Sequence, residues 1–182
     1  METYETTLNN ARLVVKNIFA KIQAYPHFKE IQNRMQEAQK NIGHTFSDIS
    51  YLAVAFCRTK IVTTADGDNN KTYQNDALAQ LGDAVLKLVI TANAFSQEKD
   101  KKQNQEAMEA WATNENLCKT RAKLDLSQYA YHETHFYNNA PAENQVSVGK
   151  HDALIESVIG AIYLDSDFSS VTDWIYKYVY EA

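Results

Sequence analysis

The sequence predicts an all-α fold. Hydrophobic residues make up 45% of its 182 residues, which is typical of a chain that folds around a core. There are only 5 glycines and 2 prolines, so few residues interrupt regular structure. Apolar residues recur at helical spacing in most segments, with no strand-rich block and no glycine-rich phosphate loop between them. Together these observations favour long helices joined by few turns.

The first two predicted helices are amphipathic. One covers residues 5 to 24 and ends before Pro26, because the residue that precedes a proline avoids the helical region. The next runs from about Phe28 to Asn41, where Gly43 is placed to end it. Nothing in these helices calls for chemistry, so we interpret them as a packing or dimer-contact element.

The remaining elements follow from caps and loop residues. Ser47 or Asp48 can cap a third helix that reaches about Cys57. The segment Thr63 to Asn75 is rich in Asp, Asn and Gly, and we interpret it as an ordinary turn because the spaced ligands of a calcium loop are missing. The later helices are expected at Asn75 to Phe95, after a cap at Thr113 or Asn114, at Asp152 to Asp165, and at Val171 to Tyr180.

The central segment, Asn75 to Ile90, is predicted to be an apolar helix that keeps its acids on one side. At about 100° per residue, Asp76, Ala79 and Asp83 fall on one face. The opposite face collects the large apolar residues Leu78, Leu81, Val85, Leu88 and Val89.

The segment His151 to Asp165 repeats this design, with Asp152 and Glu156 on an otherwise apolar helix. Two buried helices that each carry acids predict a shared carboxylate site, and carboxylates that share a site favour a hard divalent cation.

Bulk properties exclude several classes of function. The net charge of −5 excludes a broadly basic nucleic-acid binder, so contact with nucleic acid needs a local basic patch, a metal or a separate module. Cys57 and Cys118 form no metal-binding or disulfide pattern and are expected to be reduced core thiols. The N-terminus lacks the pattern of a signal peptide, and no apolar stretch reaches the length of a membrane span. We therefore expect a cytoplasmic protein with no membrane partner.

Four blocks of the sequence resemble the ribonuclease III family. The central stretch Asn75 to Leu86 is similar to the family's signature helix, Asn-Glu-x-Leu-Glu-Phe-Leu-Gly-Asp-Ala-Val-Leu. The segment Glu156 to Asp165 is similar to the family's second acidic block, and Ile42 to Asp48 and Asn114 to Lys119 resemble two others. The blocks stand in the family's order between about Asn41 and Ile175. We assign residues 41–182 to a ribonuclease III-like endonuclease domain and residues 1–40 to an N-terminal helical arm.

This resemblance implies a helical endonuclease that cuts double-stranded or structured RNA. It also implies a homodimer and Mg²⁺, with Mn²⁺ as a substitute, held by four acids from two helices. Bound metal would reverse the local sign of charge, which removes the objection raised by a net charge of −5. Because the sequence ends at Ala182 without a double-stranded-RNA-binding domain, we expect affinity to rest on the catalytic domain, on partner proteins or on a compact substrate.

The acids of the family carry over only in part. Asp83 and Glu156 match the first-block Asp and the second-block Glu, and carboxylates among such apolar neighbours would be costly to bury without a partner. The other two acids fall on Ala79 and Ala153, although Asp152 stands one place before Ala153. We interpret Asp83, Glu156 and Asp152 as candidate metal ligands and candidate catalytic residues.

Three further positions have open interpretations. Asp76, seven residues before Asp83, matches the family's other acidic position and is a supporting candidate catalytic residue. Asp76 and Asp152 could equally serve as helix N-caps. Lys87, one turn after Asp83, is placed to pair with it or to line the site, and Gln80 replaces the Phe that contacts the partner subunit in the family.

The sequence thus leaves three functional hypotheses. The first is a metal-dependent endoribonuclease of ribonuclease III type that leaves a 5′-phosphate and a 3′-hydroxyl. The second is a catalytically inactive ribonuclease III fold that serves as an RNA-binding or ribonucleoprotein scaffold, since Ala79 lacks a ligand. The third is a recent or engineered change at residue 79 that silences an active enzyme; the further differences at Gln80 and Asp152 argue against it.

Overall fold

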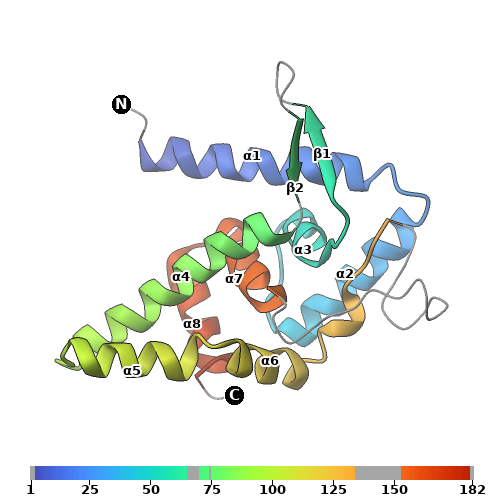
Figure 1. Ribbon diagram of the computed structural model, residues 1–182. Helices are drawn as coiled ribbons and strands as arrows, with labels where there is room; N and C mark the ends of the chain where they lie inside the picture. Colours follow the sequence, from blue (N-terminus) through green and yellow to red (C-terminus); the bar gives the residue numbers. More distant parts are fainter. Residues whose placement is uncertain (1–2, 65–69, 74, 134–152, 181–182) are drawn as a thin grey trace.

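The computed structural model confirms a mostly helical fold (Figure 1). It describes residues 3–64, 70–73, 75–133 and 153–180. Within these ranges the helices are α1 (Tyr4–Ile22), α2 (Phe28–Ile42), α3 (Ile49–Phe56), α4 (Asn75–Ser96), α5 (Lys101–Trp111), α6 (Asn114–Lys123), a short 3-10 turn (Ser127–Tyr129), α7 (Leu154–Asp165) and α8 (Phe168–Tyr178).

The centre of the fold is the pair of helices α4 and α7, which cross each other (Figure 1). Helix α7 is buried along most of its length and packs on α3 as well as on α4. Residues of α1 and α2 also enter the same hydrophobic cluster, among them Ile18, Ile22 and Ile31. The N-terminal helices therefore contribute to the core that supports α3, α4 and α7, and a domain boundary at residue 40 stays a prediction.

The helix ends predicted from Gly43, Asp48 and Thr113 are confirmed. Asp48 caps α3, its side chain accepting a hydrogen bond from the Ser50 N–H at 2.9 Å. Gly43 ends α2 in the left-handed region with φ of 70°, a conformation that glycine adopts at little cost. Thr113 caps α6. A capping box between Asp100 and Gln103 starts α5.

The interpretation of residues 63–75 as an ordinary turn is wrong at its two ends. Residues Ile61–Thr64 form strand β1 and residues Asn70–Tyr73 form strand β2, paired antiparallel with Ile61 opposite Tyr73 and Thr64 opposite Asn70. Alternation over only four residues per strand is too short to stand out from the polar loop residues between the strands. This hairpin is the one β-sheet in the described part of the chain, so the all-α class still holds.

The buried face of α4 is rotated from the predicted one. Leu88 is 55% exposed and Leu81 is half-buried, whereas Ala79 and Gly82 are buried against the rest of the protein. Small residues face α7 because they allow the two helix backbones to approach closely. By length and composition α4 alone among the described helices could cross a membrane, and its central packing accounts for that apolar character.

Candidate functional site

Two glycines define the crossing of α4 and α7. A Cβ placed on Gly82 would lie 1.8 Å from the carbonyl oxygen of Glu156 and 2.8 Å from the backbone nitrogen of Gly160. A Cβ placed on Gly160 would lie 2.4 Å from the carbonyl oxygen of Leu78. Both neighbours are backbone atoms, so only glycine fits at either position.

This crossing brings the backbones around Asp83 and Glu156 close together. Asp83 directly follows Gly82, and Gly82 packs on the backbone of Glu156, so the two acids occupy adjacent positions on facing helices. Both side chains are neither fully buried nor fully exposed, which leaves their carboxylates within reach of solvent and ligands. Glu156 stands in the first turn of α7, where the helix dipole favours a negative charge.

One carboxylate oxygen of Asp83 forms an ion pair with a lysine. The Lys87 Nζ donates to Asp83 Oδ2 at 2.6 Å, one helical turn further along α4. The pairing foreseen from the sequence is therefore present.

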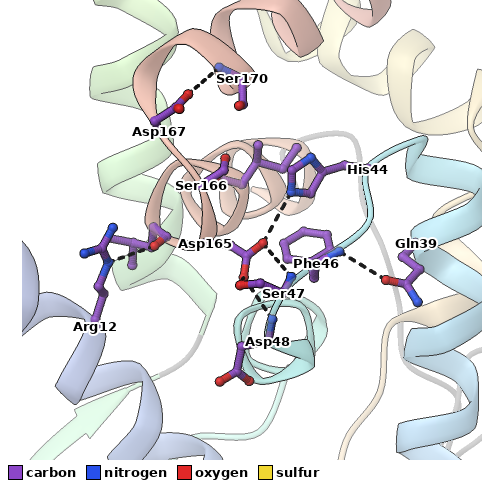
Figure 2. A network of polar contacts seen from close by, with 12 residues as sticks. Arg12, Gln39, His44, Phe46, Ser47, Asp48, Asp165, Ser166, Asp167 and Ser170 are labelled. Carbon is purple, nitrogen blue, oxygen red and sulfur yellow. Dashed lines mark hydrogen bonds and ion pairs between the residues drawn. The ribbon is translucent and has the colours of Figure 1, made fainter.

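Hydrogen bonds at both ends of α7 hold it in place. Near its start, Ser157 is fully buried and its Oγ donates to the carbonyl oxygen of Ala55 at 2.9 Å, which fixes α7 on α3. At its end, the Arg12 Nε donates to the carbonyl oxygen of Leu164 at 2.9 Å, so α1 also anchors this helix (Figure 2).

Asp165, the last residue of α7, was not singled out by sequence reasoning. Its side chain is 1% exposed and accepts hydrogen bonds from Ser47 N at 2.9 Å, Ser47 Oγ at 2.6 Å and Asp48 N at 3.0 Å (Figure 2). His44 Nε2 lies 3.4 Å from the same carboxylate. Asp165 therefore ties the end of the second acid helix to the segment that caps α3. The one signal in the sequence was an acid closing an otherwise apolar helix.

The other predicted site residues have different outcomes. Asp76 is exposed in the first turn of α4, its Oδ1 accepts from the Ala77 N–H, and seven residues of helix separate it from Asp83 by about 10 Å along the axis. Ala79 is 4% exposed and carries no ligand atom. Asp152 lies outside the described residues, and Ala153 stands at the start of α7 without a side-chain cap. The roles predicted for Asp76 and Asp152 stay predictions.

The donor chemistry of Asp83 and Glu156 fits a single Mg²⁺. This cation is usually bound through one or two carboxylates, with waters and substrate phosphates completing its coordination. The described residues contain no group of three or more His, Cys, Asp or Glu side chains placed to hold a metal. Asp83 and Glu156 are the described residues that would hold such a cation.

The structure has an apolar hollow of about 320 Å³. Gln80 is exposed. The hollow opens between α1 and α4, and its lining includes Ala11, Val14 and Ile18 from α1 and Ala77 and Leu81 from α4. Helix α1 thus extends the apolar surface of α4.

The two cysteines are not part of this site. Burial raises the pKa of the Cys57 thiol to about 11, and its Sγ lies 3.9 Å from the carbonyl oxygen of Thr59. Burial likewise raises the pKa of the neighbouring Tyr131, whose hydroxyl donates to the carbonyl oxygen of Ala53 at 2.7 Å. Cys57 therefore stays protonated at neutral pH, in agreement with the expected core thiol.

Comparison with known proteins gives consistent matches. A family model described as Ribonuclease III domain matches residues 76–167. Ribonuclease 3 of Chloroflexus aggregans is 30% identical over 152 residues, which cover 81% of this chain and 64% of that protein. Ribonuclease 3 of Treponema denticola is 30% identical over 148 residues, covering 80% of this chain and 58% of that protein. The chain thus spans about three fifths of the length of these curated relatives.

Solved structures show the same likeness. The nuclease domain of ribonuclease III from Campylobacter jejuni superposes with a TM-score of 0.62 at 20% sequence identity, covering 81% of this chain and 96% of that one. That structure concerns flexibility in the region of the domain involved in dimer formation. The likeness confirms the fold that the sequence predicted.

Proposed function

The chain belongs to the ribonuclease III family, and on that premise we propose that it is a metal-dependent endoribonuclease that cuts double-stranded or structured RNA. The observation that supports this most is the glycine crossing of α4 and α7, which places Asp83 beside Glu156. A close crossing that admits no side chain is expected where two helices must present acids to one ligand.

The residues of the crossing suggest how the reaction proceeds. Asp83 and Glu156 would hold one Mg²⁺ or Mn²⁺, which when bound neutralises phosphate charge and makes a water molecule more acidic. The glycine contact sets how closely the backbones of the two helices that carry these acids approach each other. Hydrolysis would bond a water oxygen to phosphorus and break the bond from phosphorus to the 3′ oxygen, which takes up a proton, so the products would carry a 5′-phosphate and a 3′-hydroxyl.

The anchors of α7 serve this geometry indirectly. Ser157 and Asp165 fix the two ends of the helix that carries Glu156. They touch none of the reacting groups, so we regard them as positioning residues. Asp76 and Asp152 remain proposed supporting acids, and the cytoplasmic location remains a proposal.

A second candidate function is an inactive scaffold that binds RNA without cutting it. Ala79 favours it, because the buried alanine stands where the resemblance places a ligand. The two candidates differ in one measurable property, which is cleavage of RNA in the presence of a divalent cation.

The test is to incubate the purified protein with long double-stranded RNA in Mg²⁺ and in Mn²⁺, beside Asp83→Asn and Ala79→Glu. Asp173→Asn, which alters an exposed acid on α8, is the matched control. We expect wild-type cutting that Asp83→Asn lowers about a hundredfold or more, since a catalytic cation contributes several kcal/mol and each 1.4 kcal/mol is tenfold. The control is expected to cut like wild type.

Three other results would change the proposal. The absence of wild-type cutting in either metal would favour the scaffold. Cutting restored only by Ala79→Glu would indicate a lesion at that position. Cutting that survives Asp83→Asn would place the site elsewhere.

We also propose that the protein forms a homodimer through the surface that contains Gln80. The family's apolar contact is absent at this position, so the hollow between α1 and α4 would supply the apolar area instead. Val14 lines the hollow and is partly exposed, which makes it the residue most suited to a test.

A further inference from the structure

Residues 79, 83 and 87 form one stripe along α4, each a single helical turn from the next. Such i, i+4 positions lie on the same side of a helix. Ala79 leaves the first position without charge, Asp83 carries a negative charge, and Lys87 carries a positive one. Because Lys87 and Asp83 are paired at 2.6 Å, the stripe as a whole is neutral.

This neutral stripe limits the number of divalent cations that the crossing can hold. A two-metal site clamps both the attacking and the leaving oxygen, and it needs several carboxylates to balance its charge. Here the described residues offer Asp83 and Glu156, and one oxygen of Asp83 already accepts from an ammonium group. Among the described residues, the balance of charge therefore favours one divalent cation beside one lysine.

We propose that Lys87 supplies the second positive charge of a one-cation nuclease site, by donating to a phosphate oxygen of bound RNA while it stays paired with Asp83. This inference rests on the proposed function. An ammonium group has three N–H donors, and the pair with Asp83 uses one of them.

The exposure of the pair supports this assignment. The Lys87 side chain is 50% exposed and that of Asp83 is 33% exposed, so the ammonium group lies at the edge of the site and within reach of a ligand. Asp83 fixes the position of the ammonium group, which lowers the cost of ordering a flexible lysine when RNA binds.

Cation stoichiometry tests the first half of the proposal. Mn²⁺ bound to the purified chain is counted by electron paramagnetic resonance, without RNA. We expect one Mn²⁺ per wild-type chain and two in the double variant Ala79→Glu with Lys87→Met, which restores an acid and removes the ammonium group. Two Mn²⁺ on the wild-type site, or one on the double variant, would overturn the proposal.

Salt dependence of RNA binding tests the second half. Binding of a short RNA duplex is measured at increasing NaCl with Ca²⁺ in place of Mg²⁺, and a gel confirms that the duplex stays intact. Lys87→Met is expected to weaken binding and to reduce the slope of log K against log salt by about one, as for a lost phosphate contact. Lys87→Arg is expected to keep the slope.

The matched control is Lys102→Met, which removes the lysine of a comparable i, i+4 pair with Glu106 on α5. We expect it to leave the slope unchanged. Equal effects of the Lys87 and Lys102 substitutions on the salt slope would mean that Lys87 forms an ordinary surface ion pair and does not contact a phosphate. Both readouts are independent of cleavage, so failure of this inference is distinct from failure of the proposed function, which shows as absence of cutting by the wild type.

Discussion

Replacement of Gly82 by alanine tests the helix crossing most severely. The added methyl carbon would stand 1.8 Å from the carbonyl oxygen of Glu156, where ordinary contact begins at 3.4 Å. The difference between these distances, about 1.6 Å, is the separation that the two helices must accommodate. Since the obstructing atoms belong to backbone, no side-chain rotation relieves the clash.

Two effects of Gly82→Ala oppose each other. In an unconstrained helix, alanine in place of glycine would stabilise the protein by about 1 kcal/mol through helix propensity. Overpacking of a tight core contact costs about 1–3 kcal/mol, and it is largest where backbone must move. We expect a net destabilisation of roughly 2 kcal/mol or more, together with weaker Mn²⁺ binding, because the separation moves Asp83 away from Glu156.

The assay is unfolding in urea, monitored by circular dichroism. The Mn²⁺ affinity is measured separately on the folded variant. Ala84→Ser is the matched control, because it also adds one heavy atom to α4 but on its exposed face. Gly160→Ala is expected to be less severe, since its closest approach is 2.4 Å. A Gly82→Ala variant that is more stable than wild type and binds Mn²⁺ equally well would refute the crossing as described.

Three other predictions follow from the structure. Asp165→Asn is expected to lower the free energy of unfolding by about 2–3 kcal/mol, because the charge-assisted hydrogen bonds from two N–H groups and a hydroxyl are weakened. The control Asp173→Asn should change the free energy of unfolding little. Equal stability of the two variants would contradict the stabilising role of the hydrogen bonds to Asp165. Cys57 is expected to resist a thiol reagent at pH 8 that labels the partly exposed Cys118, and equal labelling of both thiols would contradict the burial of Cys57. The folded-state pKa of Cys57 is raised from 9.0 to about 11. The contribution of this thiol to the free energy of unfolding is therefore complete below pH 9 and is lost as the pH rises to 11. Val14→Asp is expected to convert a dimer to a monomer in sedimentation analysis, and an unchanged dimer would move the interface elsewhere.

The sequence was sufficient for the helices that carry local signals. Gly43, Asp48 and Thr113 act within one turn of their own positions, so their effects follow from residue type alone. The hairpin of β1 and β2 gave no such signal, because its pairing joins short strands across a polar loop. The orientation of α4 also depends on a distant partner, since Gly82 is buried by the backbone of α7.

The sequence was sufficient to identify the candidate acids but not the contacts that surround them. The resemblance identified Asp83 and Glu156 by position in two blocks, and the crossing puts them on adjacent positions. The hydrogen bonds of Asp165 join residues that are more than a hundred positions apart in the sequence, and no periodic pattern predicts such a contact. The pair of Lys87 with Asp83 was foreseen from helical spacing, but its meaning for the number of cations needed the exposure and geometry of both side chains.

The most direct test of the central claim is anomalous diffraction from crystals of the wild-type protein soaked in Mn²⁺. We expect one strong peak per chain, coordinated by the carboxylates of Asp83 and Glu156 at the crossing of α4 and α7, and its loss in Asp83→Asn crystals. A peak bound by other residues, or no peak at a saturating concentration of Mn²⁺, would contradict it.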